Sequence, residues 1–68
     1  MKGGLALKNN LKSIRIANNF SQEELTSKVG TSRQTIIAIE KGNFNPSTKL
    51  AILLAIALYT TVEEIFYF

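Results

Sequence analysis

Hydrophobic residues recur at helical spacing near the start of the chain. Leu7, Leu11 and Ile14 are separated by four and then three positions, which places them on one face of a helix. This pattern predicts a first helix over about residues 8–18. Asn19 is expected to end it, because asparagine tolerates the left-handed backbone conformation that often follows a helix.

Two short helices joined by a glycine turn are predicted in the middle of the chain. Ser21 and Glu24 form a capping-box pattern, in which each side chain accepts a hydrogen bond from the other residue's amide. Gly30 is expected to end this helix, since glycine takes a left-handed turn without strain. Ser32 opens the next helix, which is predicted over about residues 33–41.

Two further helices are predicted in the last third of the chain. Ser47 precedes an apolar segment that ends at Leu58, and this segment predicts the fourth helix. Thr61 and Glu64 repeat the capping-box pattern at the start of the fifth helix. Together these two helices are expected to extend over about residues 47–66.

These elements predict an all-α fold, a single domain over residues 1–68 in which five helices form a bundle. A chain of 68 residues buries a modest core, so its stability must come from well-packed helices, from oligomerisation or from both. A short terminal β pairing stays open as an addition to this fold. In that pairing Ile65–Phe68 would lie beside Gly4–Leu7.

The composition narrows the classes of function. The sequence contains no cysteine and no histidine, which excludes disulfides and disfavours zinc sites and acid–base catalysis near neutral pH. We therefore expect no catalytic residues, no metal site and no cofactor. The net charge of +3 gives only a mild preference for polyanions such as nucleic acids.

Neither apolar stretch of the sequence predicts contact with a membrane. The nine residues from Leu50 to Leu58 are far fewer than the roughly 20 that a helix needs to span a bilayer. The first ten residues lack the apolar core of a secretory signal. The sequence thus leads us to expect a cytoplasmic protein without membrane partners.

Residues 21–42 have the pattern of a helix-turn-helix. Two helices that meet at a wide angle need a small residue at their contact, a glycine in the turn and apolar residues just beyond it. These positions are held by Thr26, Gly30, Ile36 and Ile39. The start of the second helix would then project outward, where it can enter the major groove of DNA.

Side chains suited to DNA gather around this second helix. Arg33 can read guanine and Gln34 can read adenine, and an apolar side chain suits a thymine methyl group. Gln22, Lys41 and Asn43 are placed to contact phosphates. A merely solvated helix start is the alternative interpretation. The candidate DNA-binding residues are Gln22, Ser32, Arg33, Gln34, Thr35, Ile37, Ala38, Lys41 and Asn43.

The chain resembles the Xre/Cro-type helix-turn-helix family, which has the lambda-repressor-like fold. The likeness rests on the segments NLKSIR, SQEELTSKVGTSRQTI, IEKGNFNPS and VEEIF, which together extend over about Leu11 to Phe66. It implies a transcriptional regulator, expected to be a repressor, that binds a palindromic operator in double-stranded DNA as a homodimer. It also implies a partly buried salt bridge between Arg15 and Glu40, so Arg15 is not counted among the base readers.

The chain departs from the family pattern at several positions. Thr26 stands where a smaller alanine is usual, and Tyr59 stands where glycine or asparagine is usual and would be strained at a positive φ. Apolar residues also occupy positions that are usually polar, and a contiguous apolar patch marks an interface. The candidate dimer interface consists of Leu53, Ile56, Tyr59, Phe66 and Phe68.

Two other functions stay open at this point. A protein-interaction module, such as an antitoxin or a partner subunit of a larger regulator, is favoured by the apolar surface of the fourth helix. This function needs a protein partner, and it can coexist with DNA binding. A small enzyme is the third hypothesis, but the sequence offers no convergent acid–base set for catalysis.

Overall fold

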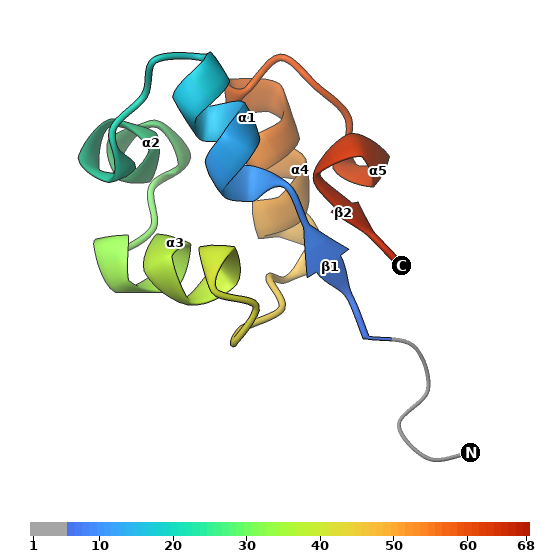
Figure 1. The fold of residues 1–68 in the computed structure, drawn as a ribbon. Coiled ribbons are helices and arrows are strands. Elements are labelled where there is room, and N and C mark those ends of the chain that lie inside the picture. The colour runs from blue at the N-terminus through green and yellow to red at the C-terminus, as the bar shows by residue number, and fades with distance from the viewer. Residues whose placement is uncertain (1–5) are drawn as a thin grey trace.

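Five helices and one pair of short strands form the fold of residues 6–68, the part of the chain that the computed structural model describes (Figure 1). The helices are α1 (Leu11–Ala17), α2 (Gln22–Val29), α3 (Arg33–Glu40), α4 (Thr48–Ala57) and α5 (Val62–Ile65). The strands are β1 (Lys8–Asn9) and β2 (Phe66–Tyr67). The predicted five-helix bundle is thus confirmed, with a small terminal sheet added to it.

The prediction of the first helix is wrong at its start. Lys8 and Asn9 are extended in β1, and α1 begins only at Leu11, whose amide donates to Asn9 Oδ1 at 3.0 Å. The periodicity of apolar residues continued through the strand, so it could not mark this boundary. The predicted end is confirmed, because Asn19 follows α1 with a φ of 61°.

The capping box predicted at the start of α2 is present. The Ser21 hydroxyl accepts from the Glu24 amide at 3.0 Å, and the Glu24 carboxylate accepts from the Ser21 amide at 2.8 Å. At the other end Gly30 has a φ of 73°, as predicted, and its amide donates to the Thr26 carbonyl at 2.9 Å. Local sequence signals therefore define both ends of this helix.

This capping box makes the stability of the protein depend on pH. The Ser21 amide, helped by the Ser21 hydroxyl, holds the pKa of Glu24 below its ordinary value. Because the folded-state pKa is the lower one, the stabilisation is present above the ordinary pKa and is lost as the pH falls through the folded-state pKa. We expect Glu24→Gln to flatten the acid limb of a plot of thermal midpoint against pH.

The matched control for this measurement is Glu23→Gln. It removes the same charge from the same helical turn but leaves the box intact. Thermal unfolding followed by circular dichroism between about pH 5 and pH 3 covers the ordinary titration of glutamate. Equal slopes for the two variants would show that the box does not contribute to the pH dependence.

The second capping box, predicted at the start of α5, forms only in part. Thr61 Oγ1 accepts from the Glu64 amide at 3.2 Å, as expected. The Glu64 carboxylate, however, accepts from the hydroxyl of Thr60 at 2.6 Å instead of turning back to the Thr61 amide. A hydroxyl one residue earlier thus takes the place that the box pattern assigns to the backbone.

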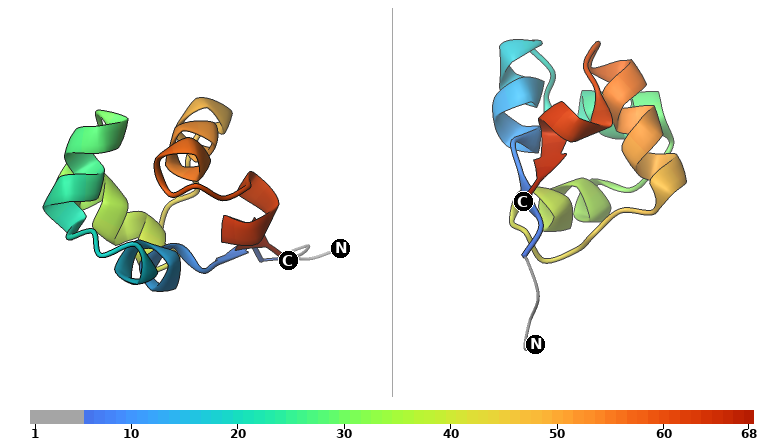
Figure 2. Two further views of the ribbon diagram at one scale, coloured as in Figure 1. Left: turned by 90° about the horizontal axis from the view of Figure 1, so that it is seen from above. Right: turned by 90° about the vertical axis from the view of Figure 1, so that its right-hand side faces the viewer.

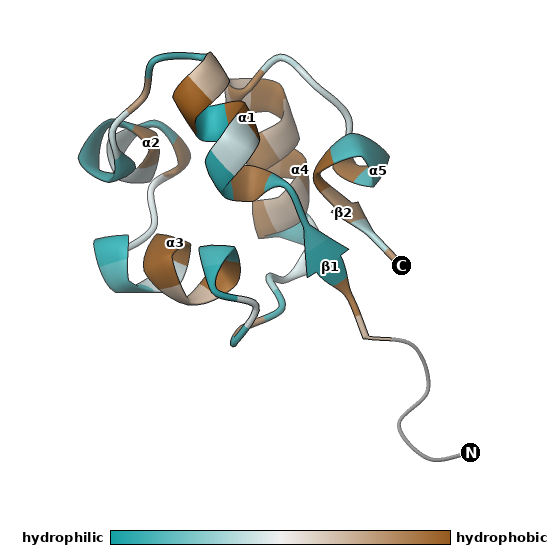
Figure 3. Ribbon diagram, viewed as in Figure 1, coloured by the Kyte–Doolittle hydropathy of each residue, from teal (hydrophilic) through white to brown (hydrophobic). Residues whose placement is uncertain are grey.

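The core lies between α1, the helix pair α2–α3 and the long helix α4. Its largest fully buried side chains come from every helix: Leu11, Leu25, Ile36, Ile39, Leu54, Leu58 and Ile65. Burying one such side chain contributes roughly 1.5–3 kcal/mol. Helix α4 is brown along most of its length in Figure 3, as its apolar sequence requires. Over residues 6–68, no helix has the length and apolarity needed to cross a membrane.

The two strands pair near the ends of the chain. They are antiparallel, with Lys8 opposite Tyr67 and Asn9 opposite Phe66, and Figure 2 shows them side by side. The expected partner segment, Gly4–Leu7, therefore ends one residue before the strand that actually pairs. Its first two residues lie outside the described part of the chain. Asn9 also connects this ribbon to α3, since its Nδ2 donates to the Ile39 carbonyl at 2.9 Å.

Candidate nucleic-acid interface

Helices α2 and α3 lie together at one side of the molecule, with α4 and α5 toward the other (Figure 2). The turn between them passes through Gly30, whose positive φ ends α2 and lets the chain turn into α3. Thr26 is half-buried where the helices meet, and its hydroxyl donates to the Gln22 carbonyl at 2.7 Å. The Thr26 hydroxyl at this contact thus has a hydrogen-bond partner.

The start of α3 is exposed to solvent. The Ser32 hydroxyl caps the helix by accepting from the Thr35 amide at 3.1 Å, and it also lies 2.9 Å from the Thr35 hydroxyl. Arg33 and Gln34 are exposed in the first turn, whereas Ile36 is fully buried and anchors the helix. The structure therefore presents Arg33 and Gln34 outward and holds Ser32 and Thr35 closer to the backbone.

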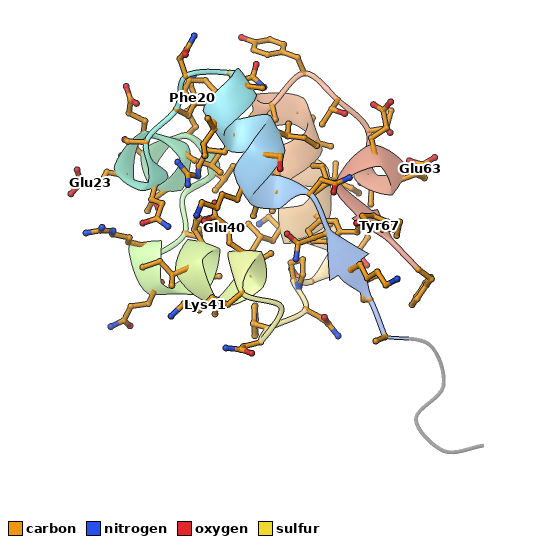
Figure 4. The ribbon with its side chains drawn as sticks, in the orientation of Figure 1. Phe20, Glu23, Glu40, Lys41, Glu63 and Tyr67 are labelled. Atoms are coloured by element: carbon orange, nitrogen blue, oxygen red, sulfur yellow. The ribbon has the colours of Figure 1, made fainter. Side chains whose placement is uncertain are left out.

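Other candidate residues follow along the same outer side. Ile37 and Ala38 are half-buried in the middle of α3, with part of each side chain accessible. Lys41 and Asn43 are exposed just beyond the helix, and Figure 4 shows Lys41 on the side of α3 that is turned away from α1. Phe44, which the sequence interpretation did not single out, is 48% exposed in the loop after α3. The only signal in the sequence that could have identified Phe44 is the presence of an aromatic residue within the polar stretch GNFNP.

The salt bridge implied by the family resemblance is present beneath this face. Arg15 Nε donates to Glu40 Oε2 at 2.7 Å, and the two side chains are only 9% and 6% exposed. A second guanidinium nitrogen of Arg15 donates to the Phe20 carbonyl at 2.8 Å. Figure 4 shows Glu40 on the side of α3 that faces α1. The pair therefore fixes the end of α3 against α1.

The Gln22 side chain forms two hydrogen bonds within the protein, and its contact with a phosphate stays a prediction. Its Nε2 donates to Glu40 Oε1 at 3.1 Å, and its Oε1 accepts from Arg33 Nε at 3.3 Å. The side-chain amide thus joins α2 to both ends of α3. Sequence reasoning missed these links, because separations of 18 and 11 residues carry no periodic signal.

The candidate dimer residues divide into exposed and buried ones. Ile56 and Tyr59 are 67% and 82% exposed, and Phe68 is exposed as well. Leu53, in contrast, is half-buried and packs against the core. Phe66 is only 9% exposed, so its assignment to the surface is corrected: strand residues alternate between faces, and Phe66 points inward where Tyr67 points outward.

One exposed apolar stripe remains on α4 and the turn after it. Ile52 and Ile56 are four positions apart on α4, so they share a face, and Tyr59 is exposed in the turn that follows. Ile52 was not singled out from the sequence, since it lies within an unbroken apolar run. Tyr59 adopts a φ of 57°, so the strain expected at this position is present. A shallow apolar groove of about 320 Å³, lined by Ile52 and Phe68 among others, adjoins the stripe.

Comparison with known proteins agrees with this geometry. The family described as "Helix-turn-helix" matches residues 11–65. An uncharacterized HTH-type transcriptional regulator of Methanocaldococcus jannaschii is 50% identical over 62 residues, which cover 91% of this chain and 94% of that protein. The uncharacterized HTH-type transcriptional regulator YgzD of Bacillus subtilis is 41% identical over 61 residues, covering 90% of this chain and 92% of YgzD.

A solved structure shows the same arrangement. The crystal structure of the restriction-modification controller protein C.AhdI from Aeromonas hydrophila superposes with a TM-score of 0.75 at 33% sequence identity. The match covers 79% of this chain and 82% of that one. With the helix-turn-helix geometry and the sequence relatives, this places the chain in the Xre/Cro-type helix-turn-helix family, and the protein is a DNA-binding transcriptional regulator.

Proposed function

We propose that the protein represses transcription by binding a palindromic operator as a homodimer, with α3 in the major groove. The exposed first turn of α3 is the observation that carries this proposal. Arg33 and Gln34 project from it, while Ile36 and Ile39 hold the helix to the core. A helix anchored in this way can insert its N-terminal side chains between the DNA backbones.

Each exposed side chain has a chemical role in this complex. Arg33 would bond guanine through O6 and N7, and Gln34 would bond adenine through N6 and N7. The accessible part of Ile37 would contact a thymine methyl group. Lys41 and Asn43, beyond the end of α3, would contact phosphates and so set the register of the domain without reading bases.

The exposed stripe on α4 supports the homodimer. Ile52 and Ile56 form an exposed apolar face of α4, with Tyr59 exposed in the turn after it, and Phe68 lines the groove that adjoins Ile52. For such a dimer to bind a palindrome, its two-fold axis has to set the two copies of α3 on the same face of the duplex. Half-sites are then expected about 34 Å apart, which is one turn of DNA.

Ile56→Glu is expected to convert dimers into monomers, because it places a charge in the middle of the apolar stripe. Sedimentation or light scattering measures the mass in solution. Ile16→Glu is the matched control, since Ile16 is also exposed but belongs to α1. Leu53→Glu is a poorer test, because Leu53 packs against the core and its replacement would also weaken the fold. An unchanged mass for Ile56→Glu would rule out this interface.

Selection of bound sequences from random duplex DNA at about 150 mM salt tests DNA reading. We expect recovery of an inverted repeat with half-site centres about one helical turn apart. Recovery of no motif, with binding that vanishes as salt rises, would show that the basic charge acts alone.

A protein-interaction module is the second candidate function. The observation that favours it is the apolar stripe with its adjoining groove, which could hold another protein instead of a second copy of this chain. Such a partner would purify with the protein in a fixed ratio. This function would lead if the DNA selection returned no motif.

A further inference from the structure

The two sides of the α4 stripe carry opposite charges. On the side of α2, Lys49 is exposed in the first turn of α4 and lines a hollow together with Val29 at the end of α2. On the side of α5, Glu63 is exposed and lines the apolar groove together with Ile52. Figure 2 shows α4 between the pair α2–α3 on one side and α5 on the other. The apolar stripe is therefore bordered by a positive and a negative side.

Neither of these charges has an ionic partner within residues 6–68, where the one salt bridge joins Arg15 and Glu40. Lys49 also lies at an unfavourable place, because the start of a helix has a partial positive charge that repels a lysine. We propose that Lys49 of one copy forms an ion pair with Glu63 of the partner subunit. This pairing rests on the homodimer proposed above and determines how its two copies are arranged.

The opposite charges select the direction of the two-fold axis relative to α4. An axis that lies in the interface and runs along α4 brings the α2 side of one copy to the α5 side of the other. An axis that runs across α4 brings like sides together, so that lysine would face lysine. The first arrangement sets Lys49 against Glu63 of the partner subunit, and symmetry forms this contact twice in each dimer.

The two residues also lie at the same level along α4. Lys49 belongs to the first turn of this helix, and the groove that Glu63 lines includes Ile52 from the same half. A two-fold axis along α4 keeps every residue at its own level, so residues that pair across it must share a level. A second lysine on the α2 side, Lys28, lines a hollow with Tyr59 beyond the end of α4 and so lies at a different level from Glu63.

Binding to a palindrome requires the same axis for an independent reason. Both copies of α3 have to lie on one face of the duplex, so the axis must point from the protein toward the DNA. Figure 1 shows α4 running from the level of α3 toward the opposite side of the molecule, and Figure 2 shows it nearly end-on from above. An axis along α4 therefore places both copies of α3 at one end of the dimer, whereas an axis across α4 places them at opposite ends.

The test reverses the two charges singly and together. Reversal is used because an exposed pair contributes little when one partner is only removed, whereas two like charges in contact repel each other. We expect Lys49→Glu and Glu63→Lys each to raise the dissociation constant of the dimer roughly tenfold, and the double variant to return it to within about threefold of the wild-type value. Sedimentation equilibrium measures these constants. The matched control is Lys12→Glu, which reverses an exposed charge on α1.

Mixing the two single variants gives a sharper result. In a mixed dimer of Lys49→Glu with Glu63→Lys, each altered residue meets an opposite charge, whereas in either parent dimer it meets a like charge. We therefore expect the mixed dimer to exceed the share that random exchange of copies would give. Native mass spectrometry, with one variant labelled with nitrogen-15, measures the three dimers, and thermal unfolding shows that each variant is folded.

Three results would overturn the pairing. The first is a mixed dimer that forms no more often than random exchange predicts. The second is an unchanged dissociation constant for Lys49→Glu, whose fold is expected to hold because the start of a helix favours a negative charge. The third is rescue of Glu63→Lys by Lys28→Glu instead of Lys49→Glu, because the axis would then be inclined to α4. A wild-type protein that stays monomeric contradicts the homodimer itself, whereas a wild-type dimer that charge reversal leaves intact contradicts the pairing alone.

Discussion

Glu40→Ala is expected to lower the free energy of unfolding by roughly 3–5 kcal/mol. The substitution leaves the guanidinium of Arg15 buried without its counter-charge, since that side chain is only 9% exposed. It also removes the acceptor of the Gln22 amide. A domain of this size has a total stability of roughly 3–10 kcal/mol, so most of it would be lost. Denaturation by urea, followed by circular dichroism, measures the change.

Two further variants make this result specific to the buried pair. Glu63→Ala removes an exposed carboxylate from α5 and is expected to change stability by less than about 0.5 kcal/mol. The double variant Arg15→Met/Glu40→Leu replaces both charges with apolar groups and should recover much of the loss, because no unpaired charge remains. If the free energy of unfolding of Glu40→Ala lay within roughly 1 kcal/mol of the wild-type value, Arg15 would have to reach solvent or another acceptor in the variant.

Gln34→Ala is expected to weaken binding to the selected operator by roughly 1–3 kcal/mol and to relax the sequence preference at one position. Gln34 is exposed in the first turn of α3, beside Arg33, where a side-chain amide can bond both N6 and N7 of adenine. Truncation to alanine removes both bonds but keeps the helix, since alanine is a strong helix former. Dissociation constants for the operator and its single-base variants measure both effects.

Lys41→Ala provides the contrast for this prediction. Lys41 is exposed beyond the end of α3 and turned away from α1 (Figure 4), so it would contact phosphate oxygens and not bases. Its removal should weaken all duplexes alike and reduce the salt slope by about one. If Gln34→Ala instead kept the full sequence preference of the wild type, α3 would not be the reading helix.

Local signals in the sequence were enough to predict most of the helices. Ser21, Ser32 and Ser47 each accept a hydrogen bond from the amide three residues later, and Gly30 takes the left-handed turn. These devices involve neighbours in the sequence, so their residue types reveal them. The exposed position of Arg33 and Gln34 followed from the helical spacing of the apolar residues of α3.

Features that depend on distant partners could not be predicted in this way. The start of α1 depends on β2, which lies at the other end of the chain and extends Lys8 and Asn9 into a strand. The link from Gln22 to Glu40 spans 18 residues, and the salt bridge spans 25. The salt bridge was expected only from the family resemblance. Burial of Phe66 likewise depends on the direction that β2 takes after α5.

The pairing of β1 with β2 should be the last part of the molecule to fold. It brings together residues as far as 59 positions apart, since Lys8 lies opposite Tyr67, whereas the helices form from near neighbours. Closing so long a loop costs conformational entropy before any contact repays it, so distant pairings follow local ones. The helix-turn-helix would then be formed while the ends are still separate, and Phe68 would reach its place last. Assembly of the proposed homodimer through the α4 stripe and Phe68 would therefore follow the folding of each copy and would not guide it.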